Sequence, residues 1–299
     1  MSRKPSNHRR AALFALGAIA LWSTLALLGL KLARVPPFLL VGIALVLGAL
    51  CGARGISLRV RPSILILGVY GLFAYHFCLF LALRLAPPVE ANLVNYLWPL
   101  LIVVLSPLLV PGTRLRPRHV AGALLGFGGA ALLVSGGRLG FSGEGLAGYL
   151  LALAAAVIWS TYSLLTKRMG EFPTSTIATF CLVSGALALA CHAALEPAYV
   201  PSGRELPYLA LMGVGPMGAA FYLWDRALKA GDPRVVGTLA YLTPLLSTLM
   251  VATFGGGRLG PASAVAMALI VGGAALGTWP RRESPAPAAA RGAHPSPES

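Results

Sequence analysis

Residues 96–101 read YLWPLL, and residues 241–246 read YLTPLL. The two hexapeptides differ at one position, and each places a proline in the middle of a long apolar stretch. Proline removes a backbone hydrogen bond and kinks a helix, so its position within a helix is a structural feature. The same kink signal recurs after 145 residues in a chain of 299 residues, which indicates an internal repeat.

Two further pairs of segments support the repeat. Residues 22–28 (WSTLALL) match residues 159–165 (WSTYSLL) at an offset of 137, and residues 129–132 match residues 273–276 (both GAAL) at an offset of 144. The three matches occur in the same order at nearly constant offsets. These matches predict that one copy of the repeat spans residues 11–135 and the second spans residues 146–279. The alternative is chance similarity between apolar segments.

The composition favours a membrane protein over a soluble one. Apolar residues make up 57% of the chain, charged residues 11%, and the mean hydropathy is +0.77. Soluble domains carry roughly 25% charged residues, and a membrane-spanning helix needs about 20 apolar residues. The sequence therefore predicts an all-α polytopic membrane protein with ten transmembrane helices, at residues 11–32, 35–52, 62–83, 87–110, 117–135, 146–167, 173–193, 206–228, 233–254 and 261–279.

The distribution of charge predicts the orientation of these helices. With the N-terminus inside, 18 of the 24 Lys and Arg residues fall on the inner side and 6 on the outer side, as cytoplasmic segments require. Both termini are then cytoplasmic: residues 1–10 form an N-terminal tail, and residues 280–299, rich in Pro, Ala and Ser, a disordered C-terminal tail. Five crossings per copy is an odd number, so the two repeats must be inverted, as in many transporters.

A set of aromatic residues is predicted to lie near the membrane midplane. Membrane Trp and Tyr residues usually prefer the interfaces, so such a set needs an explanation. Packing between helices would explain any single residue, but the group as a whole favours a cavity lined by aromatic rings. Its members are Trp22, Tyr75, His76, Tyr96, Trp98, Trp159 and Tyr241. An ionisable group at this depth is a functional candidate, so His76 is either a solute contact or a packing residue.

Other residues in the predicted spans suggest moving parts and an entrance. Pro99 and Pro244 occupy matched positions and are predicted to be paired hinges, with static kinks as the alternative. Asn92 and Asn95 lie in the outer half of the fourth span and are predicted to line the outer approach to the cavity. Asp225 and Arg226, about a turn inside the cytoplasmic end of the eighth span, are expected to form an interfacial ion pair, and a coupling carboxylate at Asp225 is the alternative.

Glycine pairs spaced four residues apart are predicted to let helices approach closely. They are Gly48 with Gly52, Gly122 with Gly126, and Gly273 with Gly277.

With two inverted five-helix halves, a Trp-Ser-Thr segment in each half and a proline in the fourth helix of each, the chain resembles the EamA-type branch of the drug/metabolite transporter superfamily. The positions Tyr75-His76, residues 96–99 and Trp159 resemble the YddG-type aromatic amino-acid exporters within it. The resemblance implies export of amino acids across a bacterial inner membrane by alternating access. It also assigns Tyr75, His76, Tyr96, Trp98, Pro99 and Trp159 to a central cavity.

Several other functions are disfavoured or left as alternatives. The basic residues punctuate apolar runs instead of forming one face, so nucleic acid is not an expected partner. No metal-binding or catalytic motif is present, so we expect no cofactor, no metal site and no enzyme activity, and no protein partner is implied. The expected partners are small amino-acid solutes and the lipid bilayer, and the alternative is export of another small metabolite or a cationic drug on the same fold.

Overall fold

The structure is a computed structural model that describes residues 5–57, 59–137, 145–169, 172–254 and 261–279. Within these ranges the chain is helical and contains no strand. Residues 1–4 of the predicted N-terminal tail and the predicted disordered tail 280–299 lie outside the described residues. The α-helices are α1 Pro5–Ser23, α2 Leu25–Lys31, α3 Pro37–Leu50, α4 Pro62–Val69, α5 Tyr75–Leu85, α6 Pro88–Asn95, α7 Trp98–Leu109, α8 Pro117–Ser135, α9 Leu146–Met169, α10 Ile177–Leu195, α11 Leu206–Val214, α12 Ala220–Ala230, α13 Pro233–Leu239, α14 Leu242–Phe254 and α15 Pro261–Thr278.

Within the described residues, nine helical segments are long and apolar enough to cross a membrane. They are Arg9–Lys31, Pro62–Leu85, Pro88–Leu109, Pro117–Ser135, Leu146–Met169, Thr174–Leu195, Leu206–Ala230, Pro233–Phe254 and Pro261–Thr278, and each matches a span predicted from the sequence. The remaining prediction, residues 35–52, coincides with α3, which has 14 residues. At 1.5 Å per residue α3 is shorter than the roughly 30 Å hydrocarbon core.

Proline decides where many of these helices begin. Six of the helices after α1 start at a proline, namely α3, α4, α6, α8, α13 and α15. The first residue of a helix has no intrahelical partner for its N–H, and proline has no N–H and a helix-compatible φ angle. The same residue that breaks a helix interior therefore marks the start of many helices in this chain.

Several long segments are interrupted near their middles. Short π-helical turns occupy Tyr70–Ala74 (η2) between α4 and α5, and Gly215–Ala219 (η4) between α11 and α12. Their positions differ by 145 residues, the same offset that separates Pro99 from Pro244. π-helical turns of this kind are frequent at functional sites.

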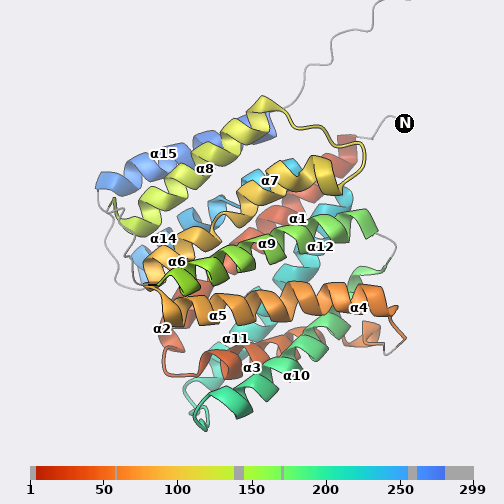
Figure 1. Ribbon diagram of the computed structural model, residues 1–299, viewed down its shortest axis with the longest axis vertical. Helices are drawn as coiled ribbons and strands as arrows, with labels where there is room; N and C mark the ends of the chain where they lie inside the picture. The colour runs from red at the N-terminus through yellow and green to blue at the C-terminus, as the bar shows by residue number, and fades with distance from the viewer. Residues whose placement is uncertain (1–4, 58, 138–144, 170–171, 255–260, 280–299) are drawn as a thin grey trace, which may run out of the picture.

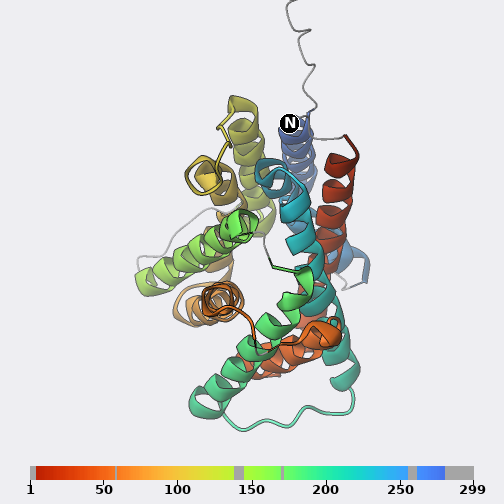
Figure 2. The same ribbon diagram turned by 90° about the vertical axis from the view of Figure 1, so that its right-hand side faces the viewer.

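The helices pack in pairs that lie far apart in the sequence. Figure 1 shows α8 beside α15 at one end of the molecule and α3 beside α10 at the other, and both pairs make extensive contact. Between these pairs lie α1, α12, α9, α5 and α7, and the perpendicular view of Figure 2 shows the same two pairs at opposite ends. Helix α1 begins and α15 ends on the same side of the molecule, on the right in Figure 1.

We use two names for the ends of the helices. The N-terminal face carries residues 52–57, 110–116 and 230–232, and the opposite face carries residues 32–36, 86–87 and 196–205.

The glycine pairs predicted from the sequence lie at close helix contacts. A Cβ atom built on Gly122 of α8 would lie 2.7 Å from the carbonyl oxygen of Gly273 on α15. A Cβ built on Gly48 of α3 would lie 2.9 Å from the Cα of Gly218 in η4. Both contacts involve backbone atoms, which cannot rotate away, so the absence of a side chain permits this packing.

We expect Gly122→Val to lower the melting temperature of the purified protein in detergent, because the new side chain would force α8 and α15 apart. The expected destabilisation is about 1–3 kcal/mol, the usual effect of overpacking a tight contact. The matched control is Gly128→Val in the same helix, where a Cβ would meet no atom within 4 Å. Equal melting temperatures for the two variants would contradict the role assigned to the α8 and α15 contact.

Candidate functional site

A cavity of about 600 Å³ lies between the interrupted helices. Eight of the sequence-predicted site residues line it, namely Trp22, Tyr75, His76, Asn92, Asn95, Tyr96, Trp98 and Trp159. Further lining residues lie at or just beyond helix ends, among them Ala33 and Val35 between α2 and α3, Leu83 near the end of α5, and Pro88 at the start of α6. The cavity therefore runs from the middle of the molecule toward the opposite face.

Aromatic rings form the inner end of the cavity. The ring of Trp22 lies 5.7 Å from that of Trp159, 6.3 Å from that of Trp98 and 5.1 Å from that of Trp224, between centroids. The Trp22 indole N–H donates to the carbonyl of Pro216 at 3.1 Å, and Pro216 lies in the π-helical turn η4. The interrupted backbone of one segment thus fixes a ring that comes from another.

Sequence reasoning missed two members of this aromatic group. Phe221 lines the cavity, with its ring 5.7 Å from that of Trp159. Trp224 is 1% exposed and lies behind Trp22 and Trp98, with its indole N–H 3.0 Å from the hydroxyl oxygen of Ser163. Both lie on α12, one turn apart, beside the π-helical turn, and this aromatic spacing next to Pro216 is the sequence signal that could have revealed them.

His76 and its neighbours form the polar part of the wall. The His76 Nδ1 atom lies 2.5 Å from the carbonyl oxygen of Leu72, one turn earlier in the chain. The Asn95 amide nitrogen donates to the Tyr75 hydroxyl at 3.3 Å, and the Tyr75 ring lies 5.2 Å from that of Trp159. The described lining contains no Asp, Glu, Lys or Arg, so it has no permanently charged side chain.

Tyr241 and Pro99 do not line the cavity but shape it from behind. In a regular helix the Leu100 N–H would bond the Tyr96 carbonyl four residues earlier. Here the helix is interrupted between α6 and α7, and the Tyr241 hydroxyl accepts from the Leu100 N–H at 3.1 Å and donates to the Tyr96 carbonyl at 3.2 Å. One side chain from the break between α13 and α14 therefore bridges the broken bond of another segment.

The two predicted hinge prolines lie just after interruptions in their segments. Residues 96–97 separate α6 from α7 ahead of Pro99, and residues 240–241 separate α13 from α14 ahead of Pro244. Each proline lacks the N–H that would close the preceding turn, so the chain breaks before it and not at it.

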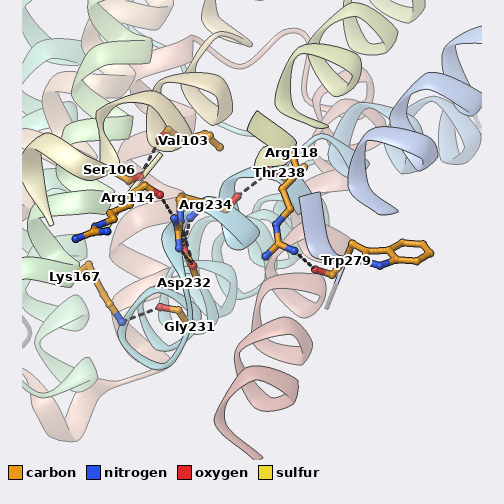
Figure 3. Close-up of polar contacts among 10 residues, drawn as sticks. All are labelled: Val103, Ser106, Arg114, Arg118, Lys167, Gly231, Asp232, Arg234, Thr238 and Trp279. Atoms are coloured by element: carbon orange, nitrogen blue, oxygen red, sulfur yellow. Dashed lines mark hydrogen bonds and ion pairs between the residues drawn. The ribbon is translucent and has the colours of Figure 1, made fainter. Parts of the chain in front are cut away.

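Polar contacts join the helix ends at the N-terminal face (Figure 3). The Lys167 ammonium donates to the carbonyls of Lys229 and Gly231 at 2.8 and 2.9 Å. The Arg234 guanidinium bonds the Asp232 carboxylate and the Arg114 carbonyl. These contacts link the ends of α9, α12 and α13 to one another and to the segment between α7 and α8.

Asp225 lies deeper on the same side and forms a different ion pair from the one expected. Its carboxylate lies 2.9 Å from the Lys229 ammonium and also accepts from the Thr174 hydroxyl. The Arg226 guanidinium instead lies over the ring of Phe14. The prediction of an Asp225 and Arg226 pair was wrong, because adjacent helical residues do not face each other, whereas residues four apart do.

The Asp232 carboxyl is ionised because of its partner. Burial alone would raise the pKa of this group, but the hydrogen bonds and charge of Arg234 outweigh burial and hold the pKa below its usual value. A lowered carboxyl pKa stabilises the folded state above the unfolded pKa, and this contribution is lost as the pH falls through the folded value. The Asp232 carboxylate is therefore charged at neutral pH, as its ion pair with Arg234 requires.

A second polar cluster holds the rim of the cavity at the opposite face. The buried Glu196 carboxylate accepts from the backbone N–H groups of Phe38 and Leu39 at the start of α3, at 3.0 and 3.2 Å. It also binds the Arg84 guanidinium at the end of α5, at 2.9 Å. Carboxylates are favourable at helix N-termini, so this group fixes α3 against α5 and α10 while leaving the cavity between them.

Comparison with known proteins identifies the family. The model of the EamA-like transporter family matches the chain twice, over residues 9–135 and 146–279. The chain belongs to the EamA-like transporter family. This places it in the drug/metabolite transporter superfamily. The first matched stretch ends where α8 ends, and the second begins where α9 begins.

Individual relatives in this family are similar over most of their length. The aromatic amino acid exporter YddG of Ancylobacter novellus is 48% identical over 278 residues, which cover 90% of this chain and 96% of that protein. The exporter of the same name from Salmonella typhimurium is 30% identical and covers 82% of this chain and 88% of its own. A crystal structure of a chain with 48% identity matches with a TM-score of 0.87, over 91% of this chain and 97% of that one.

These findings fix the class of protein. The EamA-like chain is a multi-pass membrane transporter, and membership of this family indicates a protein that moves solutes and not an enzyme.

We expect Tyr241→Phe to destabilise this transporter, because it leaves the partly buried Leu100 N–H and Tyr96 carbonyl without their partner. Such losses cost about 1–3 kcal/mol and should appear as a lower melting temperature in detergent. The control is Tyr208→Phe, which removes a hydroxyl for which the described residues provide no hydrogen-bond partner. If the two variants melted alike, the bridge would carry no stabilising energy.

Proposed function

We propose that this protein exports amino acids, aromatic ones prominently and others with broad specificity, through the aromatic cavity. The observation that carries the proposal is the cavity itself: rings of Trp22, Trp98, Trp159 and Phe221 surround a space without a permanently charged side chain. Aromatic pairs contribute about 0.5–1.5 kcal/mol each beyond area burial, and they select by shape and not by charge. The names of the similar proteins point to the same class of solute.

The alternative is a small metabolite or a cationic drug on the same fold. A permanent cation in a low-dielectric cavity needs an opposite charge, since burial of an unpaired charge is costly. The described lining offers aromatic faces, which attract cations, but no carboxylate. An amino acid is neutral overall at physiological pH, so it fits this lining better than a cation or a phosphorylated metabolite.

The proposed architecture has ten transmembrane helices in two inverted five-helix repeats, residues 11–135 and 146–279. Support comes from the shared offset of 145 between the π-helical turns, between the two prolines, and between Tyr96 and Tyr241. In this scheme α3 is the second crossing along the chain and brings the nine long segments to ten. It packs tightly between η4 and α10. Its shortness is accommodated by protein contacts that cover much of its surface, with eight buried residues of 14.

The proposed orientation puts both termini in the cytoplasm of a bacterial inner membrane. The N-terminal face then faces the cytoplasm, as the excess of Lys and Arg requires. The cavity runs toward the periplasm, and the contacts of Lys167, Arg234 and Asp232 close the cytoplasmic side. The structure then corresponds to an outward-facing state.

Transport would proceed by alternating access around the central rings. The state that accepts solute from the cytoplasm requires the contacts at the N-terminal face to open and the walls near Val35 and Pro88 to meet. Bending at the breaks before Pro99 and Pro244 would change the direction of α7 and α14 without disturbing the halves of each helix. In that change the Tyr241 hydroxyl would lose its hydrogen bonds to the Leu100 N–H and the Tyr96 carbonyl.

We expect Trp159→Ala and His76→Ala to lower tryptophan flux at unchanged amounts of folded protein, because both side chains line the cavity. Trp159 contacts Trp22, Tyr75 and Phe221, so its loss should reduce flux by about tenfold or more. The measurement is counterflow of radiolabelled tryptophan in proteoliposomes, with folded protein quantified by size-exclusion chromatography. Unchanged flux in both variants would reject the assignment of the cavity.

The orientation can be tested in cells with an impermeant thiol reagent, after the four native cysteines are replaced by serine. We expect Arg34→Cys and Gly203→Cys to be labelled from the periplasm, and Leu115→Cys to be labelled only after lysis. All three positions are exposed at the surface, so burial does not protect them. The reverse pattern would overturn the topology.

A further inference from the structure

Buried polar atoms without a partner are uncommon in folded proteins, and each one needs an explanation. Among the described residues, two such side-chain atoms belong to residues that line the cavity: the amide oxygen of Asn95 and the hydroxyl oxygen of Thr243. The Asn95 residue is 5% exposed, so its Oδ1 atom has little access to bulk water. A hydrogen-bond donor for this atom would therefore have to come from inside the cavity.

The hydrogen bond made by the Asn95 amide nitrogen indicates which kind of group can pair with Oδ1. The Asn95 nitrogen donates to the Tyr75 hydroxyl at 3.3 Å, which fixes the side chain and leaves Oδ1 as the free end. An amide oxygen accepts hydrogen bonds and cannot donate them. The complementary group on a solute is therefore an N–H or O–H donor, whereas a carboxylate would be repelled.

The surroundings favour a positively charged donor. The Tyr75 ring is held next to Asn95 and lies 5.2 Å from the Trp159 ring, so electron-rich faces surround the same corner of the cavity. An ammonium group next to aromatic faces gains electrostatic attraction in a desolvated site. Since the described lining contains no Asp or Glu, an amide oxygen is the strongest neutral acceptor that this corner provides.

We propose that Asn95 is a specificity-determining residue, whose Oδ1 accepts a hydrogen bond from the α-ammonium group of the transported amino acid while Tyr75 holds the amide in place. The proposal rests on amino-acid export as the function of the cavity and adds the group that recognises the amino end. It extends the sequence-based expectation that Asn95 lines the outer approach. The aromatic rings then select the side chain, and Asn95 selects the backbone of the solute.

The test compares three indole compounds as competitors of radiolabelled tryptophan counterflow. Tryptophan carries both charged groups, tryptamine lacks the carboxylate, and indole-3-propionate lacks the ammonium group. A site built to bond a solute group discriminates strongly against analogues that lack it. We expect the wild-type protein to bind tryptophan at least about tenfold more tightly than indole-3-propionate, and Asn95→Leu to remove most of that ratio.

Two further variants separate recognition from folding. Asn95→Asp keeps an acceptor and adds negative charge, so it should raise the inhibition by tryptamine relative to that by indole-3-propionate. Ser184→Ala is the matched control, because Ser184 is also buried with an unpartnered oxygen but lies on α10 and does not line the cavity. It should leave all three inhibition constants unchanged.

The proposal is overturned if Asn95→Leu weakens all three compounds equally, which would indicate a packing role, or if folded Asn95→Asp leaves the ratio of tryptamine to indole-3-propionate unchanged. Failure of the proposed function looks different. In that case the folded wild-type protein shows no saturable tryptophan counterflow, before any variant is compared.

Discussion

Inside a bilayer each backbone N–H and C=O group must find its partner within the protein, because the hydrocarbon offers none. Pro99 and Pro244 have no N–H to donate, and they lie near the middle of two long segments. In each segment one helix ends and another begins just before the proline. The Tyr241 hydroxyl then restores both ends of one broken bond, on Tyr96 and Leu100. The cavity exists where these breaks and the two π-helical turns prevent the helices from packing evenly.

The two sides of the cavity are held by different physical means. At the N-terminal face, Lys167, Arg234 and Asp232 join helix ends through charged groups and carbonyl oxygens, contacts that exchange readily with water when they open. At the opposite face, the Glu196 carboxylate is buried and bonded to the start of α3 and to Arg84, which ties α3 to the ends of α5 and α10. In the proposed alternating access both groups of contacts must rearrange, since the N-terminal face opens as the walls near the opposite face meet.

The absence of charged side chains from the described lining limits how the cavity can recognise a solute. Rings from α1, α7, α9 and α12 meet there, yet the described lining holds no carboxylate, ammonium or guanidinium group. Recognition must then come from shape, from ring faces and from a few uncharged hydrogen-bonding atoms. Such a set discriminates weakly among side chains of similar size, as the proposed broad specificity requires, and strongly between solutes that can and cannot satisfy a buried acceptor.

The sequence by itself determined the membrane class, nine of the spans and the residues that gather in the middle, because apolar length, proline and repeated motifs are local signals that the bilayer constrains strongly. Eight of the residues predicted for the cavity and its approach do line it. Only the tertiary structure decided that Tyr241 serves the backbone of another segment, that Trp224 and Phe221 complete the rings, and that Asp225 pairs with Lys229. These outcomes depend on which faces of distant helices meet, and that choice is a property of packing in three dimensions that no single segment encodes.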